Sequence, residues 1–163
     1  MFNNSHKKLV MAFGTFDLFH AGHENYLNQA KSHGDNLIVV IARDKTVKQI
    51  KGELPLNSEK KRAKAVNNSG IADKVVLGHH HDKHYVLKKY RPNVIALGYD
   101  QVVFTQKIQK TLIDLKLDAE IVRLESFFPQ VYKSTLLKEK LKNTLGKENP
   151  KTSSLTTQIK ITA

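Results

Sequence analysis

The sequence contains no cysteine, and this absence excludes several kinds of chemistry. Without thiols the chain forms no disulfide, has no thiol nucleophile, and offers zinc none of the sulfur ligands that are common in structural sites. Such a chain needs no oxidising compartment in which to fold. We therefore expect a cytoplasmic protein.

Long apolar runs are also missing. No stretch reaches the roughly 18 consecutive apolar residues that a membrane-spanning helix needs. The segment from Met1 to Lys8 is polar and leads directly into the first apolar run, so it does not resemble a secretory signal. We expect neither a signal peptide nor a membrane partner.

Acidic and aromatic residues are scarce relative to basic ones. The 27 lysines and arginines outnumber the 15 acidic residues and give a net charge of +12, while aromatic residues make up 7%. A basic surface can bind nucleic acid or smaller polyphosphates. Because lysine predominates over arginine and no interleaved aromatic pattern appears, the composition favours polyphosphates over nucleic acid.

The residues that are present predict an α/β fold. Five short apolar runs are expected to form strands, and the run at 36–42 is continuous enough for a parallel strand covered on both faces. Segments with helical periodicity separate these runs, as in right-handed βαβ units. The sequence predicts one Rossmann-like, doubly wound domain over 1–145 with a five-stranded parallel sheet. The lysine-, serine- and threonine-rich remainder, 146–163, is expected to be disordered.

Local signals predict the boundaries of these elements. Strands are expected at 9–13, 36–42, 74–77, 94–97 and 121–124, and helices at about 24–33, 58–68, 83–90, 105–115 and from 133 onward. Gly34 is expected to end the first helix, and Ser58 to cap the second. Segment 43–57 is expected to be a polar loop that carries Lys48 among other lysines.

The stretch from Gly14 to His23 reads Gly-Thr-Phe-Asp-Leu-Phe-His-Ala-Gly-His and joins the first strand to the first helix. Unpaired amides and the helix dipole make such a junction a binding place for phosphate. His20 and His23 are three residues apart, so we expect their rings on one side of the first helical turn. Two imidazoles beside exposed amides are suited to hold a polyphosphate while charge moves on it.

Other interpretations of the histidine pair are open. The pair can ligate a metal, but no third ligand of suitable type is evident nearby, and we expect no metal site formed by the protein. The pair can also be ordinary surface histidines, which the surrounding glycines disfavour. The loop matches neither the dinucleotide-binding glycine fingerprint nor the P-loop. A second histidine run, His79 to His81, is interpreted as a solvated loop.

The two-part motif Gly-Thr-Phe-Asp and His-x-Gly-His resembles the signature of the cytidylyltransferase-like nucleotidyltransferases. Within that superfamily the chain is most similar to the archaeal-type FAD synthases, over about residues 8 to 142. This narrower resemblance rests on Ala42 to Lys48, Lys51-Gly52, Arg62, Leu97 to Gln101 and Lys133 to Thr135. It implies transfer of AMP from ATP to the phosphate of FMN, which yields FAD and pyrophosphate. It also implies Mg²⁺ bound with ATP, and a homodimer.

The resemblance further implies a role for each matching residue. The implied catalytic residues are His20, His23 and Lys48, with Lys51 in place of Lys48 if the loop is shifted. The implied nucleotide-binding residues are Gly14, Thr15, Phe16, His20, Gly22, His23, Arg62, Gly98, Asp100, Lys133, Ser134 and Thr135. The histidines would steady the α-phosphate, Asp100 would accept hydrogen bonds from the ribose or base, and 133–135 would close over the other phosphates. For Arg62, a structural ion pair is the alternative.

One region departs from the related glycerol-3-phosphate cytidylyltransferases. Their Arg-Thr-Glu-Gly-Ile-Ser-Thr-Thr signature is replaced here by 126–135, in which the Ser-Thr pair alone survives. Phe127, Phe128 and Tyr132 in this segment can flank a flavin ring or simply pack the loop on the core. A CTP-dependent cytidylyltransferase acting on glycerol 3-phosphate, or on a similar small phosphorylated alcohol, is the enzyme alternative. A non-catalytic nucleotide- or RNA-binding protein is the further alternative, motivated by the basic tail.

Overall fold

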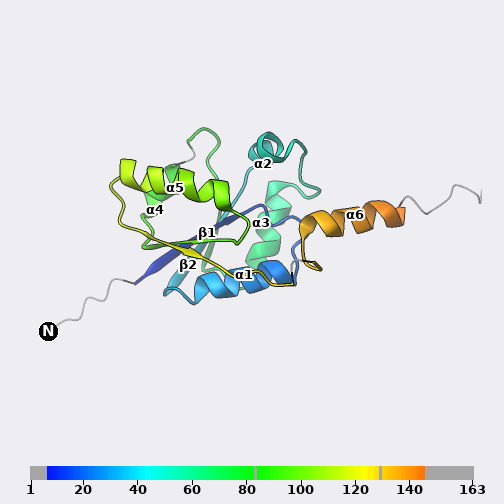
Figure 1. Cartoon of the computed structure of the whole chain (residues 1–163), viewed down its shortest axis with the longest axis horizontal. Helices are drawn as coiled ribbons and strands as arrows, with labels where there is room; N and C mark the ends of the chain where they lie inside the picture. The colour runs from blue at the N-terminus through cyan, green and yellow to red at the C-terminus, as the bar shows by residue number, and fades with distance from the viewer. Residues whose placement is uncertain (1–6, 83, 129, 146–163) are drawn as a thin grey trace, which may run out of the picture.

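The computed structural model describes residues 7–82, 84–128 and 130–145, in which strands and helices alternate. The strands are β1 (Leu9–Gly14), β2 (Asn36–Ile41), β3 (Lys74–Leu77), β4 (Val94–Leu97) and β5 (Glu120–Arg123). The helices are α1 (Ala21–Lys31), α2 (Asp44–Lys51), α3 (Glu59–Asn68), α4 (Tyr85–Tyr90), α5 (Val102–Asp114) and α6 (Ser134–Leu145). Figure 1 shows the sheet between helical layers, with α6 set apart at one end.

The five strands form one sheet in the order β3-β2-β1-β4-β5, and every neighbouring pair is parallel. The chain starts in the middle, winds outward through β2 and β3, and then winds the other way through β4 and β5. This reversal confirms the predicted doubly wound fold. At the reversal, β1 pairs with β4 from Val10–Val94 to Ala12–Ala96, and the pairing stops before either strand ends.

The sheet is covered on both faces. One core joins α1 and α3 to one face, and a second core joins α4 and α5 to the other. Along β1, Val10 and Ala12 belong to the first core and Met11 to the second, and all three are fully buried. Burial on both faces explains why these strands are continuous apolar runs rather than alternating ones.

The predicted loop at 43–57 contains helix α2, so that prediction is wrong for the first half of the segment. Val47 is the one buried residue of the helix, whereas Ile50 and all three lysines are exposed, so little apolar surface marks it as part of the fold. The Asp44 amide donates to Glu59 Oε2 at 2.9 Å, and the Glu59 amide donates to Asp44 Oδ2 at 3.2 Å. This reciprocal cap comes from the start of the next helix, which no local pattern reveals.

The other boundaries differ by a few residues. Helix α4 begins at Tyr85 and α5 at Val102, and Ser58 caps α3 as predicted, with its hydroxyl accepting from the Lys61 amide at 3.5 Å. The expected disorder at 146–163 lies outside the described residues, and the domain boundary at 145 stays a prediction. In the described part of the chain, no helix is both long and apolar enough to cross a membrane.

Gly34 does not end α1 in the predicted manner. The helix ends at Lys31, and Gly34 does not have the left-handed conformation of a helix-ending glycine. A Cβ on Gly34 would lie 2.6 Å from the carbonyl oxygen of Lys8 and 2.7 Å from the Val10 side chain. The glycine is therefore required because the turn after α1 packs directly against the start of β1.

We expect Gly34→Ala to destabilise the fold by about 1–3 kcal/mol, because the new methyl group must displace backbone rather than a flexible side chain. Gly78→Ala is the matched control, since the nearest atom to its Cβ would be the Ile41 carbonyl oxygen at 3.5 Å. Urea denaturation of both variants measures the difference. Equal stability of the two variants would contradict the packing argument.

Candidate functional site

The loop between β1 and α1 begins where β1 and β4 stop pairing, which is where ligands bind in doubly wound folds. Phe16 and Leu18 turn the chain in left-handed conformations, with φ of 53° and 52°. The buried Phe16 ring lies 5.2 Å from the His23 ring and 6.0 Å from the Tyr26 ring, between centroids. A Cβ on Gly14 would lie 2.6 Å from the Phe16 ring. Glycine at this position therefore lets Phe16 fold under the loop.

His20 and His23 lie side by side at the start of α1. His20 is the N-cap residue, and the two rings are stacked with centroids 3.8 Å apart and planes 17° from parallel. His20 Nδ1 accepts a hydrogen bond from the His23 amide at 3.3 Å. A neutral imidazole that accepts at Nδ1 carries its proton on Nε2. His20 Nε2 is therefore an N–H donor.

Two ring nitrogens of this pair, His20 Nε2 and His23 Nδ1, are buried without a hydrogen-bond partner among the described residues. Leaving a buried polar group unpaired costs about 1–3 kcal/mol, so such groups are rare in folded proteins. Two of them in contacting rings at a helix N-terminus point to a ligand that supplies the missing partners.

Burial keeps the pair uncharged at neutral pH. It lowers the pKa of His20 below its ordinary value. The pKa of His23 falls to about 3, first because of burial and then because of the charges of His20 and Lys51, while Asp17 acts in the opposite direction. The histidines therefore offer hydrogen bonds to a ligand, and the positive charge must come from other residues.

Gly22 makes room around the histidines. A Cβ at this position would lie 2.9 Å from the His20 ring and 3.0 Å from Cβ of Tyr132. Tyr132, from the loop between β5 and α6, stacks on His20 with ring centroids 6.1 Å apart. The glycine between the two histidines thus allows a segment from the far end of the chain to pack over them.

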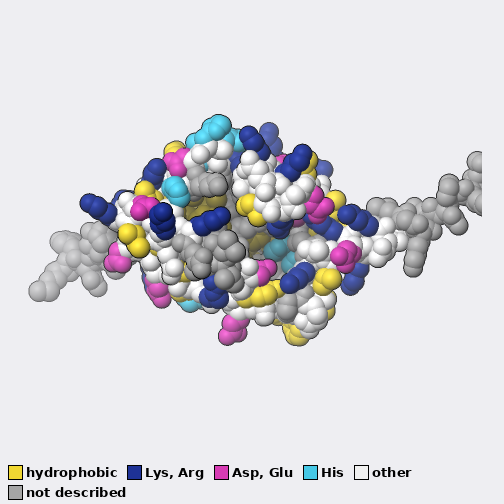
Figure 2. Space-filling model, turned by 45° about the horizontal axis from the view of Figure 1, so that its top comes forward, with side chains coloured by type: hydrophobic (Ala, Val, Ile, Leu, Met, Phe, Trp, Pro, Cys, Tyr) yellow, Lys and Arg dark blue, Asp and Glu magenta, His cyan; other side chains and the backbone are white. Residues whose placement is uncertain are grey.

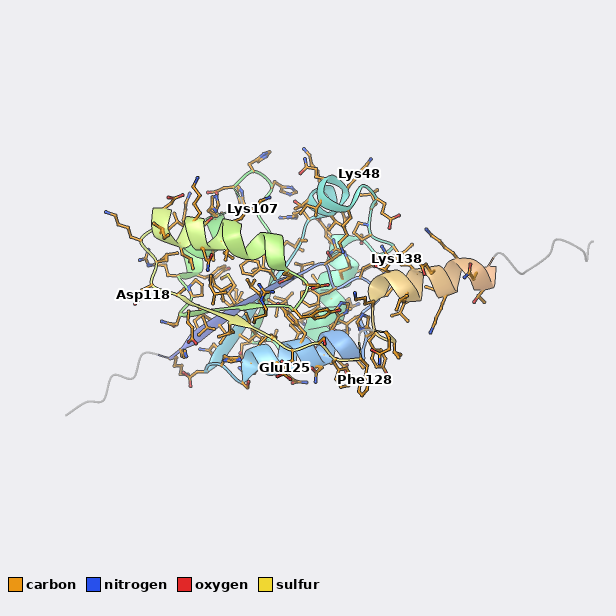
Figure 3. All side chains as sticks on the ribbon, in the orientation of Figure 1. Lys48, Lys107, Asp118, Glu125, Phe128 and Lys138 are labelled. Carbon is orange, nitrogen blue, oxygen red and sulfur yellow. The ribbon has the colours of Figure 1, made fainter. Side chains whose placement is uncertain are left out.

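Asp17 connects the β1–α1 loop to two other segments of the chain. Its carboxylate is 2% exposed and accepts hydrogen bonds from the amides of Leu56 at 2.7 Å and Asn57 at 3.1 Å. Lys138 of α6 forms an ion pair with the same carboxylate at 3.1 Å (Figure 3). Burial raises the pKa of Asp17, but these hydrogen bonds more than offset it and lower the pKa overall. The ionised carboxylate joins the loop to the α2–α3 connection and to α6.

The turn after β4 bridges the gap between β1 and β4. Gln101 donates from Nε2 to the Phe13 carbonyl at 3.1 Å and accepts from the Gly98 amide at 3.1 Å. The Tyr26 hydroxyl lies 3.0 Å from the Ala96 carbonyl and 3.3 Å from the Phe13 carbonyl. These side chains satisfy backbone groups that strand pairing leaves without partners.

Two charged residues complete this turn. Arg123 of β5 donates to the Gly98 carbonyl at 2.9 Å. Asp100 is exposed, and its charge adds to burial in raising the pKa of Tyr26, although the hydrogen bond to Phe13 opposes this. The predicted residues Gly98 and Asp100 therefore lie at the same edge of the sheet as the histidines, with the Asp100 carboxylate at the surface.

The predicted lysines Lys48 and Lys51 both lie on α2 and are exposed. Figure 3 shows Lys48 on this helix. The charge of Lys51 contributes to the lowered pKa of His23. This coupling places Lys51 within electrostatic range of the histidine pair.

Arg62 is buried, and its guanidinium contacts protein groups. It donates to the Thr15 carbonyl, to the Ala42 carbonyl at 2.7 Å and to the Asn57 carbonyl at 3.0 Å, and it pairs with Asp44 at 2.7 Å. These contacts match the structural ion pair that the sequence left as the alternative. Arg62 therefore anchors the loop between β1 and α1 through the Thr15 carbonyl.

The start of α6 faces the turn after β4. The Lys133 ammonium lies 5.7 Å from the centroid of the Tyr99 ring, a distance typical of a cation–π contact. Ser134 begins the helix, and Lys133 and Thr135 line a groove of about 500 Å³. The predicted 133–135 segment therefore lies between this groove and the turn that follows β4.

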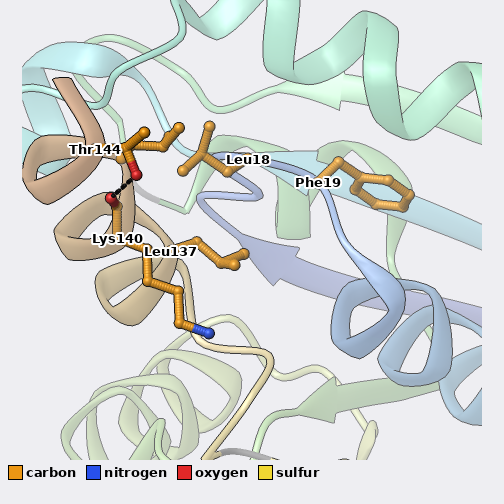
Figure 4. A pocket seen from close by; sticks show the side chains of 6 residues that line it. Leu18, Phe19, Leu137, Lys140 and Thr144 are labelled. Atoms are coloured by element: carbon orange, nitrogen blue, oxygen red, sulfur yellow. Dashed lines mark hydrogen bonds between the residues drawn. The ribbon is translucent and has the colours of Figure 1, made fainter. Parts of the chain in front are cut away.

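A second groove, of about 390 Å³, lies between the β1–α1 loop and α6 (Figure 4). Leu18 and Phe19 line one wall, and Leu137 and Leu141 line the other. Leu141 is 45% exposed, so the groove opens to solvent. Its largely apolar walls distinguish it from the polar edge that carries the histidines.

The second histidine run is exposed, in agreement with the predicted solvated loop. His79 Nδ1 accepts from the amides of His81 at 3.2 Å and Asp82 at 2.9 Å. Figure 2 shows histidine side chains gathered at the upper edge of the molecule and basic side chains spread over the visible face. In the portion of the chain that the structure describes, no three histidine, aspartate or glutamate side chains are grouped to hold a metal.

Comparison with known proteins agrees with this geometry. A family model described as cytidylyltransferase-like matches residues 11–140. An FAD synthase of Methanosarcina barkeri is 41% identical over 135 residues, which are 82% of this chain and 96% of that protein. An FAD synthase of Thermoplasma volcanium is 34% identical over 137 residues, which are 84% of this chain and 96% of that protein.

Solved structures share the fold. A lipopolysaccharide core biosynthesis protein from Thermoplasma volcanium superposes with a TM-score of 0.69 at 35% identity, covering 74% of this chain and 98% of that one. A pantoate-β-alanine ligase from Francisella tularensis has a TM-score of 0.56 at 15% identity, covers 91% of this chain and 75% of its own, and shows the fold alone. Because the family model spans most of the chain and the relatives match over nearly their whole length, the chain belongs to the cytidylyltransferase-like family.

Proposed function

We propose that the protein is an FMN adenylyltransferase, which transfers AMP from ATP to the phosphate of FMN and releases FAD and pyrophosphate. The relatives named FAD synthase, at 34% and 41% identity, support this substrate pair. The structural observation that carries the proposal is the buried, unpartnered Nε2 donor of His20 at the N-terminus of α1. A phosphate oxygen at this position completes the missing hydrogen bond.

In the proposed reaction an oxygen of the FMN phosphate attacks the α-phosphorus of ATP. A new P–O bond forms while the bond to the β-phosphate oxygen breaks, and pyrophosphate leaves with the electron pair. The attacking oxygen is already anionic at pH 7, because the second pKa of a phosphomonoester is near 6. No general base is needed, so the protein contributes positioning and stabilisation of charge.

The histidine pair is proposed to donate to the α-phosphate and to the oxygen that departs with pyrophosphate. Since both rings are neutral, Lys51 or Lys48 supplies positive charge from α2. Backbone amides of Thr15 and Phe16 would bind phosphate oxygens. In the remaining roles, Asp100 binds the ribose or base, Lys133, Ser134 and Thr135 bind the β- and γ-phosphates, and Gly14, Gly22, Gly98 and Arg62 shape the site.

Mg²⁺ is proposed to enter with ATP, held mostly by phosphate oxygens and water. This agrees with the carboxylate of the phosphate loop, since Asp17 is engaged by two amides and by Lys138. The ion would stabilise the negative charge that develops on the phosphates. From the family resemblance we further propose a homodimer, and from the absence of cysteine a cytoplasmic location.

A direct assay tests the proposed function. The protein is incubated with Mg²⁺, FMN and each nucleoside triphosphate in turn, and flavin products and pyrophosphate are separated and measured. We expect FAD from ATP. An absence of FAD would overturn the proposal, and pyrophosphate from CTP with glycerol 3-phosphate would establish the cytidylyltransferase alternative instead.

We expect His20→Asn to lower kcat by about 100-fold or more, because it removes one preorganised donor to the developing charge. Asparagine is a good N-cap residue, so the variant keeps the helix start and its thermal midpoint should stay close to that of the unaltered protein. His80→Asn, in the exposed histidine run, is the matched control and should leave kcat unchanged. Full activity of His20→Asn would show that the mechanism above is wrong.

The lowered pKa of His23 predicts a loss of stability in acid. The unfolded chain binds a proton at this residue below about pH 6.5, whereas the folded chain does so only near pH 3. Stability is therefore complete above pH 6.5 and falls as the pH decreases toward 3. Between pH 7 and 5 the unaltered protein should lose about 2 kcal/mol more than His23→Gln, in urea denaturation at each pH. Parallel pH curves for the two proteins would contradict a buried neutral His23.

A further inference from the structure

A series of aromatic rings leads outward from His20 along the loop between β5 and α6. The Tyr132 ring stacks on His20 at 6.1 Å, with planes 25° apart. The Phe127 ring stacks in turn on Tyr132 at 5.8 Å, with planes 14° apart. Tyr132 is therefore enclosed between two rings, and its contacts serve to connect the loop to the histidine pair.

Phe128 ends this series at the surface. Its side chain is 57% exposed, and its ring meets that of Phe127 at 4.9 Å with planes 78° apart. Its φ of 38° lies in the left-handed region, which is unfavourable for a bulky residue. The amides of Val131 at 2.9 Å and Tyr132 at 3.0 Å both donate to the Phe128 carbonyl and hold this conformation. Figure 3 shows Phe128 on the loop beside α1, away from the sheet.

A bulky residue held in the left-handed region costs about 1–3 kcal/mol, and such residues cluster at ligand-binding sites. Packing on the core, one of the two roles considered for these aromatics, therefore accounts for Tyr132 and Phe127 but not for Phe128. A planar, largely apolar ligand is what such a ring binds best, because aromatic systems attract one another in stacked or edge-on contacts.

We infer that Phe128, supported by Phe127, binds the isoalloxazine ring of FMN; this inference rests on the proposed function. FMN carries its phosphate and its ring at opposite ends. The ribityl chain of FMN puts roughly 8 Å between phosphate and ring when extended, since each single bond contributes about 1.5 Å before its zigzag is projected. A phosphate beside His20 and a ring beside Phe127 and Phe128 lie at the two ends of the ring series, whose steps are 6.1 and 5.8 Å.

The inference also separates the acceptor from the nucleotide. The residues proposed for ATP, Asp100 and Lys133, are linked through Tyr99 and the turn after β4, whereas Phe128 makes its ring contact with Phe127. Phe128 is therefore expected to act on the affinity for flavin and not on the affinity for ATP. It is a substrate-binding residue that determines acceptor specificity.

Phe128→Ala tests the inference. We expect KM for FMN to rise about tenfold, as loss of one stacking ring typically produces, with KM for ATP and kcat at saturating FMN unchanged. Riboflavin, which has the ring but lacks the phosphate, provides a readout that is independent of turnover. Its dissociation constant, measured by flavin fluorescence, should rise by the same factor. Phe128→Tyr, which keeps an aromatic ring, should leave KM for FMN and the riboflavin dissociation constant near those of the unaltered protein. Phe128→Leu should raise both.

Val131→Ala is the matched control, because Val131 is 42% exposed on the same loop and takes no part in the ring series. It should behave like the unaltered protein. An unchanged KM for FMN in Phe128→Ala, an equal effect of Val131→Ala, or full rescue by Phe128→Leu would each overturn the inference. The proposed function fails differently, since in that case the unaltered protein makes no FAD at all.

Discussion

The separation of β1 from β4 is the constraint on which the rest of the site depends. Pairing between these strands stops at Ala12 and Ala96, and the backbone groups beyond need other partners. Tyr26 and Gln101 provide them through the carbonyls of Phe13 and Ala96. Because side chains, and not a further strand, satisfy this edge, the chain can leave β1 in a tight loop and start α1 with its amides facing the opening. The reversal of strand order thus provides the opening in which the proposed phosphate site lies.

The β1–α1 loop lies at this opening and is held in place by ion pairs. Its own side chains offer little charge to a ligand. Asp17 is bound by two amides and by Lys138, and Arg62 binds the Thr15 carbonyl and pairs with Asp44. These charges are neutralised by partners inside the protein. Burial keeps the histidine pair neutral. In the proposed reaction the charge that opposes the phosphates would therefore come from exposed lysines such as Lys51.

Much of this fold could be predicted from the sequence because its signals are local. The continuous apolar run of β2 and the Ser58 cap depend on neighbouring residues, and the motif from Gly14 to His23 contains both the turn and the histidines. Helix α2 was missed because its cap comes from Glu59, and the role of Gly34 because its neighbour is Lys8. Contacts of this kind join segments that are distant in sequence, and no spacing rule identifies them. The Asp17–Lys138 ion pair is the extreme case, since one partner lies in a recognisable motif and the other is one of three lysines on α6.

The last segment of the domain connects the two halves of the proposed reaction. Lys138 attaches α6 to Asp17, and Tyr132, just before α6, packs on His20 in the space that Gly22 leaves. In the proposed reaction, the loop that packs on His20 is therefore the same loop that would present Phe128 to the acceptor. A change of acceptor within this fold needs a change in that loop, while the β1–α1 loop can stay as it is. This division agrees with a chain that keeps the family's histidine motif and departs from the glycerol-3-phosphate enzymes at 126–135.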